Sequence, residues 1–394
     1  MKKHTPFIVL LGCILLQGGT IGIMANCMSV FFAPIANEFG FSNFEMSLMT
    51  TIRTLAISLA MINGPKLYQK LGFNSLLAIG AAMAGIAYAS MAFLKSALAF
   101  DICCAIIGIG FGLLITIPAT IMINNWFNKS VGFYLGLSLA ASGIFGSIFS
   151  PISSSLATAY GWRVAVMAFA LFGTAMTLPA TLFLCKMAPA DNEARYGEAA
   201  VASKEVPAGK NTGGLGILLL TIIIMLVGNC ITQLTYQFSL FTKQMGMALS
   251  VAGGLNLACM LGNTGGKVIL GFLNDKIGPW KTLLLSFGLI GVALVVFVLG
   301  NETLMYIAAG IIGASFGVVV HIPSMVARAL YAEKVGWFTS LTSGIATFGS
   351  AIFASFIGYL SDALNGYTLI YLTFGLLCLL SIAIILKIAA EARS

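Results

Sequence analysis

The 394-residue sequence contains little charge. Only 8% of its residues are Asp, Glu, Lys or Arg, whereas hydrophobic residues make up 59%. Soluble domains carry about 25% charged residues, so this composition and a mean hydropathy of +1.01 exclude a soluble globular protein. The apolar runs are long and do not alternate with polar residues, which excludes a membrane β-barrel. The composition therefore predicts an all-α integral membrane protein.

The sequence also lacks the groups on which several kinds of chemistry depend. No GxxxxGK[ST] motif occurs, so no nucleotide-driven motor is predicted. The eight cysteines lie mostly in apolar runs without metal-ligand spacing, and the two histidines, His4 and His321, cannot form a cluster by sequence. We therefore expect no enzyme activity, no cofactor and no metal.

The hydropathy pattern predicts twelve membrane-spanning helices. The first apolar run continues past Met24 without a small-x-small cleavage site, so it is predicted to be a span and not a signal peptide. Six spans form an N-terminal bundle at 1–186 and six a C-terminal bundle at 215–394, joined by a flexible cytoplasmic linker at 187–214. The predicted spans are 7–33, 46–65, 75–94, 98–122, 133–157, 164–185, 215–241, 250–272, 282–299, 304–327, 338–360 and 368–388.

Positive charge predicts the orientation of these spans. With the N-terminus in the cytoplasm, fifteen of the 20 Lys and Arg residues fall at inside positions and three in outside loops. The positive-inside rule therefore predicts a multi-pass protein of the inner (cytoplasmic) membrane with both termini cytoplasmic. The net charge of +8 mostly reflects this orientation, so the expected partners are the lipid bilayer and a small solute, with no nucleic acid, and the protein is expected to be monomeric.

The two halves of the chain repeat one another. Phe111–Pro118 matches Phe316–Pro323 at a constant offset of 205, and Gly64–Gly72 corresponds to Gly271–Gly278. A third pair of matches lies in the fifth and eleventh spans. A parallel repeat of six spans predicts a transporter, with a binding site near the middle of the membrane between the two halves.

One of the repeated segments resembles a known signature. The segment Gly271–Gly278 is similar to the G-x-L-x-D-R-x-G motif of the major facilitator superfamily, although its first-half counterpart has Gln69 where Asp is usual and Phe73 where a basic residue is usual. The resemblance implies two pseudo-symmetric six-helix bundles and a secondary transporter. It also implies a gating role for the motif residues Gly271, Asp275, Lys276 and Gly278.

Two further motifs resemble the branch that holds monocarboxylate transporters and the oxalate/formate exchanger. They are NWFNK, starting at Asn125 before the fifth span, and GWR, starting at Gly161 before the sixth. In that branch a cation four residues before the loop glycine, usually an arginine, binds the substrate carboxylate, and Lys267 occupies that position here. Animal monocarboxylate transporters carry a proton-binding aspartate one turn earlier, where this chain has Asn263. The exchanger's second cation, in span 11, has no counterpart.

Lys267 and Arg53 are the two cations predicted inside spans. All twelve acidic residues fall in loops or at span ends, so a substrate carboxylate is a natural counter-ion for these two side chains. Lys267 is the candidate for direct substrate contact, with snorkelling to the membrane surface as the alternative. Arg53 lies nearer the outer end of its span and is the candidate for attracting substrate there, with a structural pair to Glu45 as the alternative.

Other polar residues in the spans are candidates for lining the site. His321 replaces Thr116 in the repeat and could donate to an anion, carry a proton, or simply pack. Pro118 and Pro323 are expected to allow helix bending. Interhelical hydrogen bonding is the alternative role for a polar row at helical spacing in the seventh span. That row is Asn229, Gln233 and Tyr236.

These observations predict a secondary transporter of small organic anions, of the monocarboxylate type, that works by alternating access. No span interior holds a carboxylate to carry a proton, so exchange of one anion for another is favoured over proton symport. His321 or the substrate anion itself would have to carry the proton in a symporter. Two alternatives remain open: an exporter of lipophilic compounds with the same fold, and a membrane sensor that binds a ligand without transport.

Overall fold

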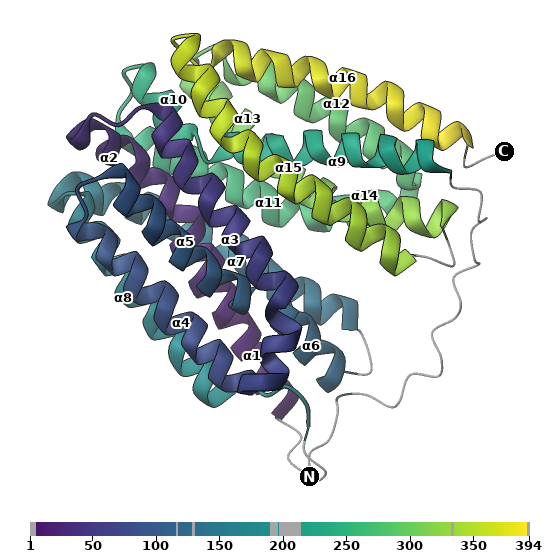
Figure 1. The fold of residues 1–394 in the computed structure, drawn as a ribbon. Coiled ribbons are helices and arrows are strands. Elements are labelled where there is room, and N and C mark those ends of the chain that lie inside the picture. The colour runs from purple at the N-terminus through teal and green to yellow at the C-terminus, as the bar shows by residue number, and fades with distance from the viewer. Residues whose placement is uncertain are drawn as a thin grey trace. The chain divides into compact units, whose positions relative to one another are not determined.

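The computed structural model describes residues 5–115, 117–127, 131–189, 196, 214–331 and 335–391 (Figure 1). Within these ranges the regular structure is helical apart from one isolated β-bridge between Phe127 and Tyr196. This confirms the predicted all-α class. The chain divides into two compact units, one formed by Met1–Phe41 with Met49–Lys204 and the other by Ser42–Leu48 with Glu205–Ser394.

The first unit is built around close packing of α4 with α5 and α8, and of α7 with η1 and α1. The segment η1 is a π-helix that continues α1, so the first predicted span is helical but not uniform. The elements in chain order are α1 (Thr5–Gln17), η1 (Gly18–Ala25), η2 (Met28–Phe31), α2 (Phe32–Phe39), α3 (Asn43–Leu71), α4 (Phe73–Ser90), η3 (Met91–Phe93), α5 (Ala97–Leu114), α6 (Ile117–Trp126), α7 (Val131–Tyr160), α8 (Trp162–Pro179) and η4 (Ala180–Leu184).

The second unit pairs α12 with α16, α11 with α13, and α9 with α15. The helix α14 packs against both α9 and α11, and therefore brings together two helices that carry candidate site residues. The elements in chain order are α9 (Leu215–Thr235), α10 (Phe238–Gln244), α11 (Leu249–Ile277), α12 (Pro279–Phe297), α13 (Glu302–Gly313), α14 (Ser315–Leu330), α15 (Val335–Ala363) and α16 (Thr368–Glu391).

Each predicted span corresponds to helix, and ten spans among the described residues are long and apolar enough to cross a membrane. The ten do not include α3 and α11, although each of these helices is 29 residues long. They correspond to the predicted spans 46–65 and 250–272. They are the least apolar of the long helices, and they are also the two that carry Arg53 and Lys267.

Three predicted spans are interrupted, and one of them, 215–241, is divided at Tyr236 and Gln237 between α9 and α10. In the span predicted at 98–122 the first helix ends at Leu114. Ile115 then has an extended backbone, and Pro118 is the second residue of α6. Proline is tolerated there because the first turn of a helix needs no N–H donor from it. The span predicted at 304–327 is divided at Ala314, whereas α14 continues through Pro323. The helix break in the second half therefore precedes the proline by more than two turns.

The final glycine of the signature loop has a backbone role in both halves. Gly278 precedes α12 with φ of 82°, and Gly72 precedes α4 with the same φ. Residues with a Cβ rarely adopt this left-handed region, whereas glycine does so readily. Of the other motif residues, Lys276 is exposed and Gly271 lies within α11. The side chain of Asp275 lies outside the described part.

The start of α3 is capped twice, within the second unit. Ser42 and Glu45 form a capping box, in which the Glu45 N–H donates to the Ser42 hydroxyl (3.2 Å) and the Ser42 N–H donates to the Glu45 carboxylate (2.8 Å). Near the end of α15, the Asp362 carboxylate accepts hydrogen bonds from the backbone N–H groups of Asn43 (3.1 Å) and Phe44 (2.8 Å). Negative charge at a helix N-terminus is stabilising, so Asp362 secures α3 to α15.

Asp362→Asn should lower the thermal stability of the purified protein, because the amide keeps an acceptor oxygen but loses the charge and one of two good acceptors. The expected cost is about 1 kcal/mol, the usual size of a helix-cap loss. The measurement is the Tm in detergent. Ser96→Ala, which removes the longer 3.4 Å cap of α5, is the comparator and should shift the Tm less. A Tm for Asp362→Asn equal to that of the unaltered protein would show that the cap contributes nothing.

Candidate functional site

Lys267 lies on α11 with its side chain partly buried against the first turn of α14. A methyl group placed on Gly317 would come within 3.3 Å of both the Cγ and the backbone nitrogen of Lys267. In the described ranges, no hydrogen bond or ion pair engages the Lys267 ammonium group. The structure thus holds the aliphatic stem in place and leaves the charge without a protein counter-ion among these residues.

Two polar neighbours on α11 also have unused hydrogen-bonding capacity. Asn263, one turn before Lys267, is only 4% exposed, and its Oδ1 has no hydrogen-bond partner among the described residues. The same holds for Oγ1 of Thr264. We call Asn263, Thr264 and Lys267 the α11 polar face. Buried polar groups are normally paired, so two unpaired oxygens about one helical turn from an ammonium without a counter-ion indicate a place where a ligand or water binds.

The polar row on α9 lies across α14 from this face. Gln233 is 6% exposed, and its Oε1 has no partner in the described part of the chain. Asn229 donates to a carbonyl of its own helix at 2.8 Å, and the partly buried Tyr236 follows the end of α9. A methyl group on Gly228 would lie 2.8 Å from Val319 of α14, so α9 and α14 touch beside this row.

Two other candidates are only partly described. His321 lies on α14 four residues after Gly317, which is about one helical turn, but its side chain lies outside the described part. Thr116, its counterpart in the repeat, falls outside the described residues altogether. Pro118 lies at the start of α6, and Pro323 lies within α14.

The sequence repeat corresponds to a similar helix contact in each unit, between α5 and α3 in the first and between α14 and α11 in the second. A methyl group on Gly112 of α5 would lie 2.6 Å from Cβ of Ala60 on α3. Gly317 is the counterpart of Gly112, and the sequence repeat aligns Lys267 with position 60 or 61. The two units therefore share this contact, but only the second places a cation at it.

Arg53 is 3% exposed and lies within the first unit. Its Nη1 donates to the Sδ of Met28 at 3.0 Å. The structural pair with Glu45 is not among the contacts of the described residues, because the Glu45 carboxylate serves the capping box of α3. In this structure Arg53 is a buried cation and not an exposed one.

The two motifs that resemble the monocarboxylate branch make structural contacts in the first unit. The Glu38 carboxylate accepts hydrogen bonds from Arg163 Nη1 (2.6 Å) and Trp162 Nε1 (2.7 Å), which fastens the end of α2 to the start of α8. Asn125 and Trp126 donate to the backbone carbonyls of residues 187 and 186, each at 2.8 Å. These hydrogen bonds give Trp162, Arg163, Asn125 and Trp126 a structural role in the first unit, and none of them involves a substrate.

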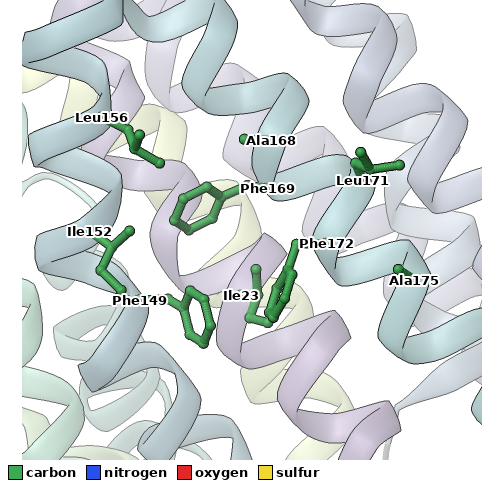
Figure 2. A pocket seen from close by; sticks show the side chains of 9 residues that line it. All are labelled: Ile23, Phe149, Ile152, Leu156, Ala168, Phe169, Leu171, Phe172 and Ala175. Carbon is green, nitrogen blue, oxygen red and sulfur yellow. The ribbon is translucent and has the colours of Figure 1, made fainter.

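A separate cavity of about 480 Å³ in the first unit is wholly apolar. Figure 2 shows Phe149, Phe169, Phe172 and Ile23 gathered around it, with carbon the only element in the side chains that line it. It offers no hydrogen-bond donor and no positive charge. It is therefore not a candidate site for an organic anion.

Comparison with known proteins identifies the family. The family model of the Major Facilitator Superfamily matches residues 14–342. The chain belongs to the major facilitator superfamily. It is accordingly a multi-pass membrane protein of that superfamily, as the signature loop predicted.

Curated relatives and solved structures add detail. The chain is 28% identical to monocarboxylate transporter 4 of Rattus norvegicus over 161 residues, which is 39% of this chain and 33% of the relative. It is 29% identical to monocarboxylate transporter 1 of Rattus norvegicus over 140 residues, or 34% and 28% of the two chains. The matches thus span about a third of the length of these relatives.

The fold is similar to that of two solved transporters. The nucleoside transporter NupG superposes with a TM-score of 0.68 at 13% identity, covering 98% of this chain and 99% of the other. A bacterial homologue of the human lysosomal transporter Spinster, in an inward-facing and occupied conformation, superposes with a TM-score of 0.68 at 15% identity, covering 100% and 97%. At these identities the likeness shows the fold alone.

Proposed function

We propose that this transporter carries small organic anions of the monocarboxylate type across the cytoplasmic membrane, by exchange of one anion for another. The observation that carries the proposal is the α11 polar face, where Lys267 has no counter-ion among the described residues. A substrate carboxylate would supply that charge in a setting where an uncompensated ammonium is costly. The similarity to monocarboxylate transporters supports this substrate class.

The candidate site residues have different proposed roles in substrate binding and in the conformational change. Lys267 binds the carboxylate as a point charge, and Asn263 and Thr264 offer hydrogen-bonding groups to the rest of the substrate. Five further polar residues line the substrate path around Lys267. Asn229, Gln233 and Tyr236 come from the polar row of the seventh span, and His321 and Thr116 are the residues that correspond in the sequence repeat. The signature loop and the prolines serve the conformational change, and both termini lie in the cytoplasm.

Lys267→Ala should abolish exchange of labelled monocarboxylates in proteoliposomes, because the substrate loses its counter-ion. Lys267→Arg should retain part of the activity, since the charge remains but the planar guanidinium binds with different geometry. The assay is counterflow with a panel of labelled formate, acetate, lactate, pyruvate and oxalate. Lys243→Ala, which removes an exposed lysine after α9, is the matched control and should exchange normally.

The same assay separates the competing functions. A ligand sensor that does not transport would show no counterflow for any anion in the unaltered protein. Full exchange by Lys267→Ala would contradict the role given to Lys267. Exchange of lipophilic compounds, unaffected by the loss of Lys267, would favour the exporter.

Arg53→Gln should raise the apparent KM for external substrate more than it lowers the maximal rate. The reason is that a second cation on α3, buried here beside Met28, would attract an entering anion whenever its surroundings open to water. Met28→Leu is the control, because it removes the sulfur acceptor and keeps the charge, and its KM should stay near that of the unaltered protein. If Arg53→Gln leaves KM unchanged while reducing the yield of folded protein, Arg53 is a structural residue.

The expected mode of coupling, exchange or proton symport, follows from the positive charge of the binding site. A cationic site without its anion should resist crossing the low-dielectric barrier, whereas the loaded site is closer to neutral. Internal anion should therefore strongly accelerate uptake of external anion, and an imposed pH gradient alone should drive little uptake into anion-free vesicles. Accumulation driven by the pH gradient, and lost in His321→Gln, would establish proton symport through His321 in place of exchange.

A further inference from the structure

The geometry points to Gly317 as a positioning residue for Lys267. We propose that the missing side chain at Gly317 creates a slot on α14 for the aliphatic stem of Lys267, and that this slot sets where the ammonium lies. The proposal deepens the function proposed above and rests on it for its effect on transport. The slot itself is a geometric claim that can be tested without transport.

The contact at Gly317 is made by the side chain of Lys267 as well as by backbone. A methyl group on Gly317 would meet Cδ1 of Leu270 at 3.1 Å, Cγ of Lys267 at 3.3 Å and the backbone nitrogen of Lys267 at 3.3 Å. Such distances require the neighbours to move by a few tenths of an ångström. Because the side chains of Lys267 and Leu270 are more easily displaced than the helix backbone, most of the adjustment falls on them.

Gly112, the corresponding glycine in the first unit, has less space around it than Gly317. A methyl group on Gly112 would come 2.6 Å from the backbone oxygen of Ile57 and 2.6 Å from Cβ of Ala60. Neither atom can rotate away, so glycine there is required for two helices to approach. At Gly317 the helices leave room for a methyl group with small adjustment. Helix packing alone therefore does not account for glycine at Gly317.

A small shift at Cγ has a larger effect at the ammonium. The stem of lysine has three further bonds beyond Cγ, so rotation about the Cα–Cβ bond moves Nζ through a longer arc than Cγ. Lysine also loses considerable rotamer freedom when its position is fixed. A slot that restricts the stem lowers that loss on substrate binding, and filling the slot displaces the charge. Misplacement of this kind weakens substrate binding and its proper alignment.

The first test compares two glycine variants in the second unit. Gly317→Ala should raise the KM for monocarboxylate exchange several-fold while leaving the Tm close to that of the unaltered protein. Gly375→Ala is the matched control, since its methyl group would meet Val295 at 3.2 Å and the Gly291 oxygen at 3.4 Å, in the contact of α16 with α12. It should leave KM unchanged. Equal KM values in the two variants would overturn the positioning role.

The second test does not depend on transport. Lys267→Cys places a sulfur at the γ position, the atom that faces Gly317, and the eight native cysteines are all buried. The probe is 2-aminoethyl methanethiosulfonate, with labelling of position 267 followed by mass spectrometry. Adding Gly317→Ala should slow labelling several-fold, and adding Gly375→Ala should not. Equal labelling rates would show that no slot exists. If labelling slows but Lys267→Ala still transports, the slot stands and the proposed function fails.

Discussion

The proposed binding site depends on an ammonium group placed within a long helix of a membrane protein, with no counter-ion among the described residues. An isolated charge in a low-dielectric interior is costly, and an ordinary packing position would exclude it. Here α11 carries Lys267 at a position that aligns with Ala60 or Met61 of α3, neither of which is charged. This comparison is informative because α3 and α11 each pack against a glycine at the equivalent position of a neighbouring helix, Gly112 of α5 and Gly317 of α14. The cation is thus an addition to the repeat and not a requirement of its packing.

Several polar side chains have a structural use, whereas buried polar atoms without a partner among the described residues occur in both units, for example in Gln17 and Thr20 of the first and in the α11 polar face of the second. Glu45 and Asp362 cap α3, and Glu38 binds the two side chains that open α8. Asn229 is satisfied by its own helix. Against this background the oxygens of Asn263, Thr264 and Gln233 have no partner among the described residues, and all lie on the two helices that contact α14. Unsatisfied groups of this kind are consistent with the proposed function, in which a ligand is bound and then released.

The sequence predicted the fold well because the relevant signals are long and repeated. Twenty-residue apolar runs and a constant offset of 205 gave the helices, and the signature loop gave the superfamily. Lys267 became a candidate because a charge in an apolar run is conspicuous. Thr264 did not, because a single threonine in a span is common. The capping role of Glu45 was missed although Ser42 precedes it at the spacing of a capping box, because its charge suggested a pair with Arg53. The break at Ala314 has no proline or charge to mark it, so only the structure locates it.

The central claim is that a substrate carboxylate is the counter-ion of Lys267. It is tested most directly by measuring how fast an amine-reactive reagent modifies individual lysines, by mass spectrometry, with and without saturating monocarboxylate. Lys243, which is exposed, serves as the internal reference in the same sample. The account predicts that the anion slows modification of Lys267 and leaves the rate at Lys243 unchanged. Modification of Lys267 at the same rate with and without the anion would contradict it.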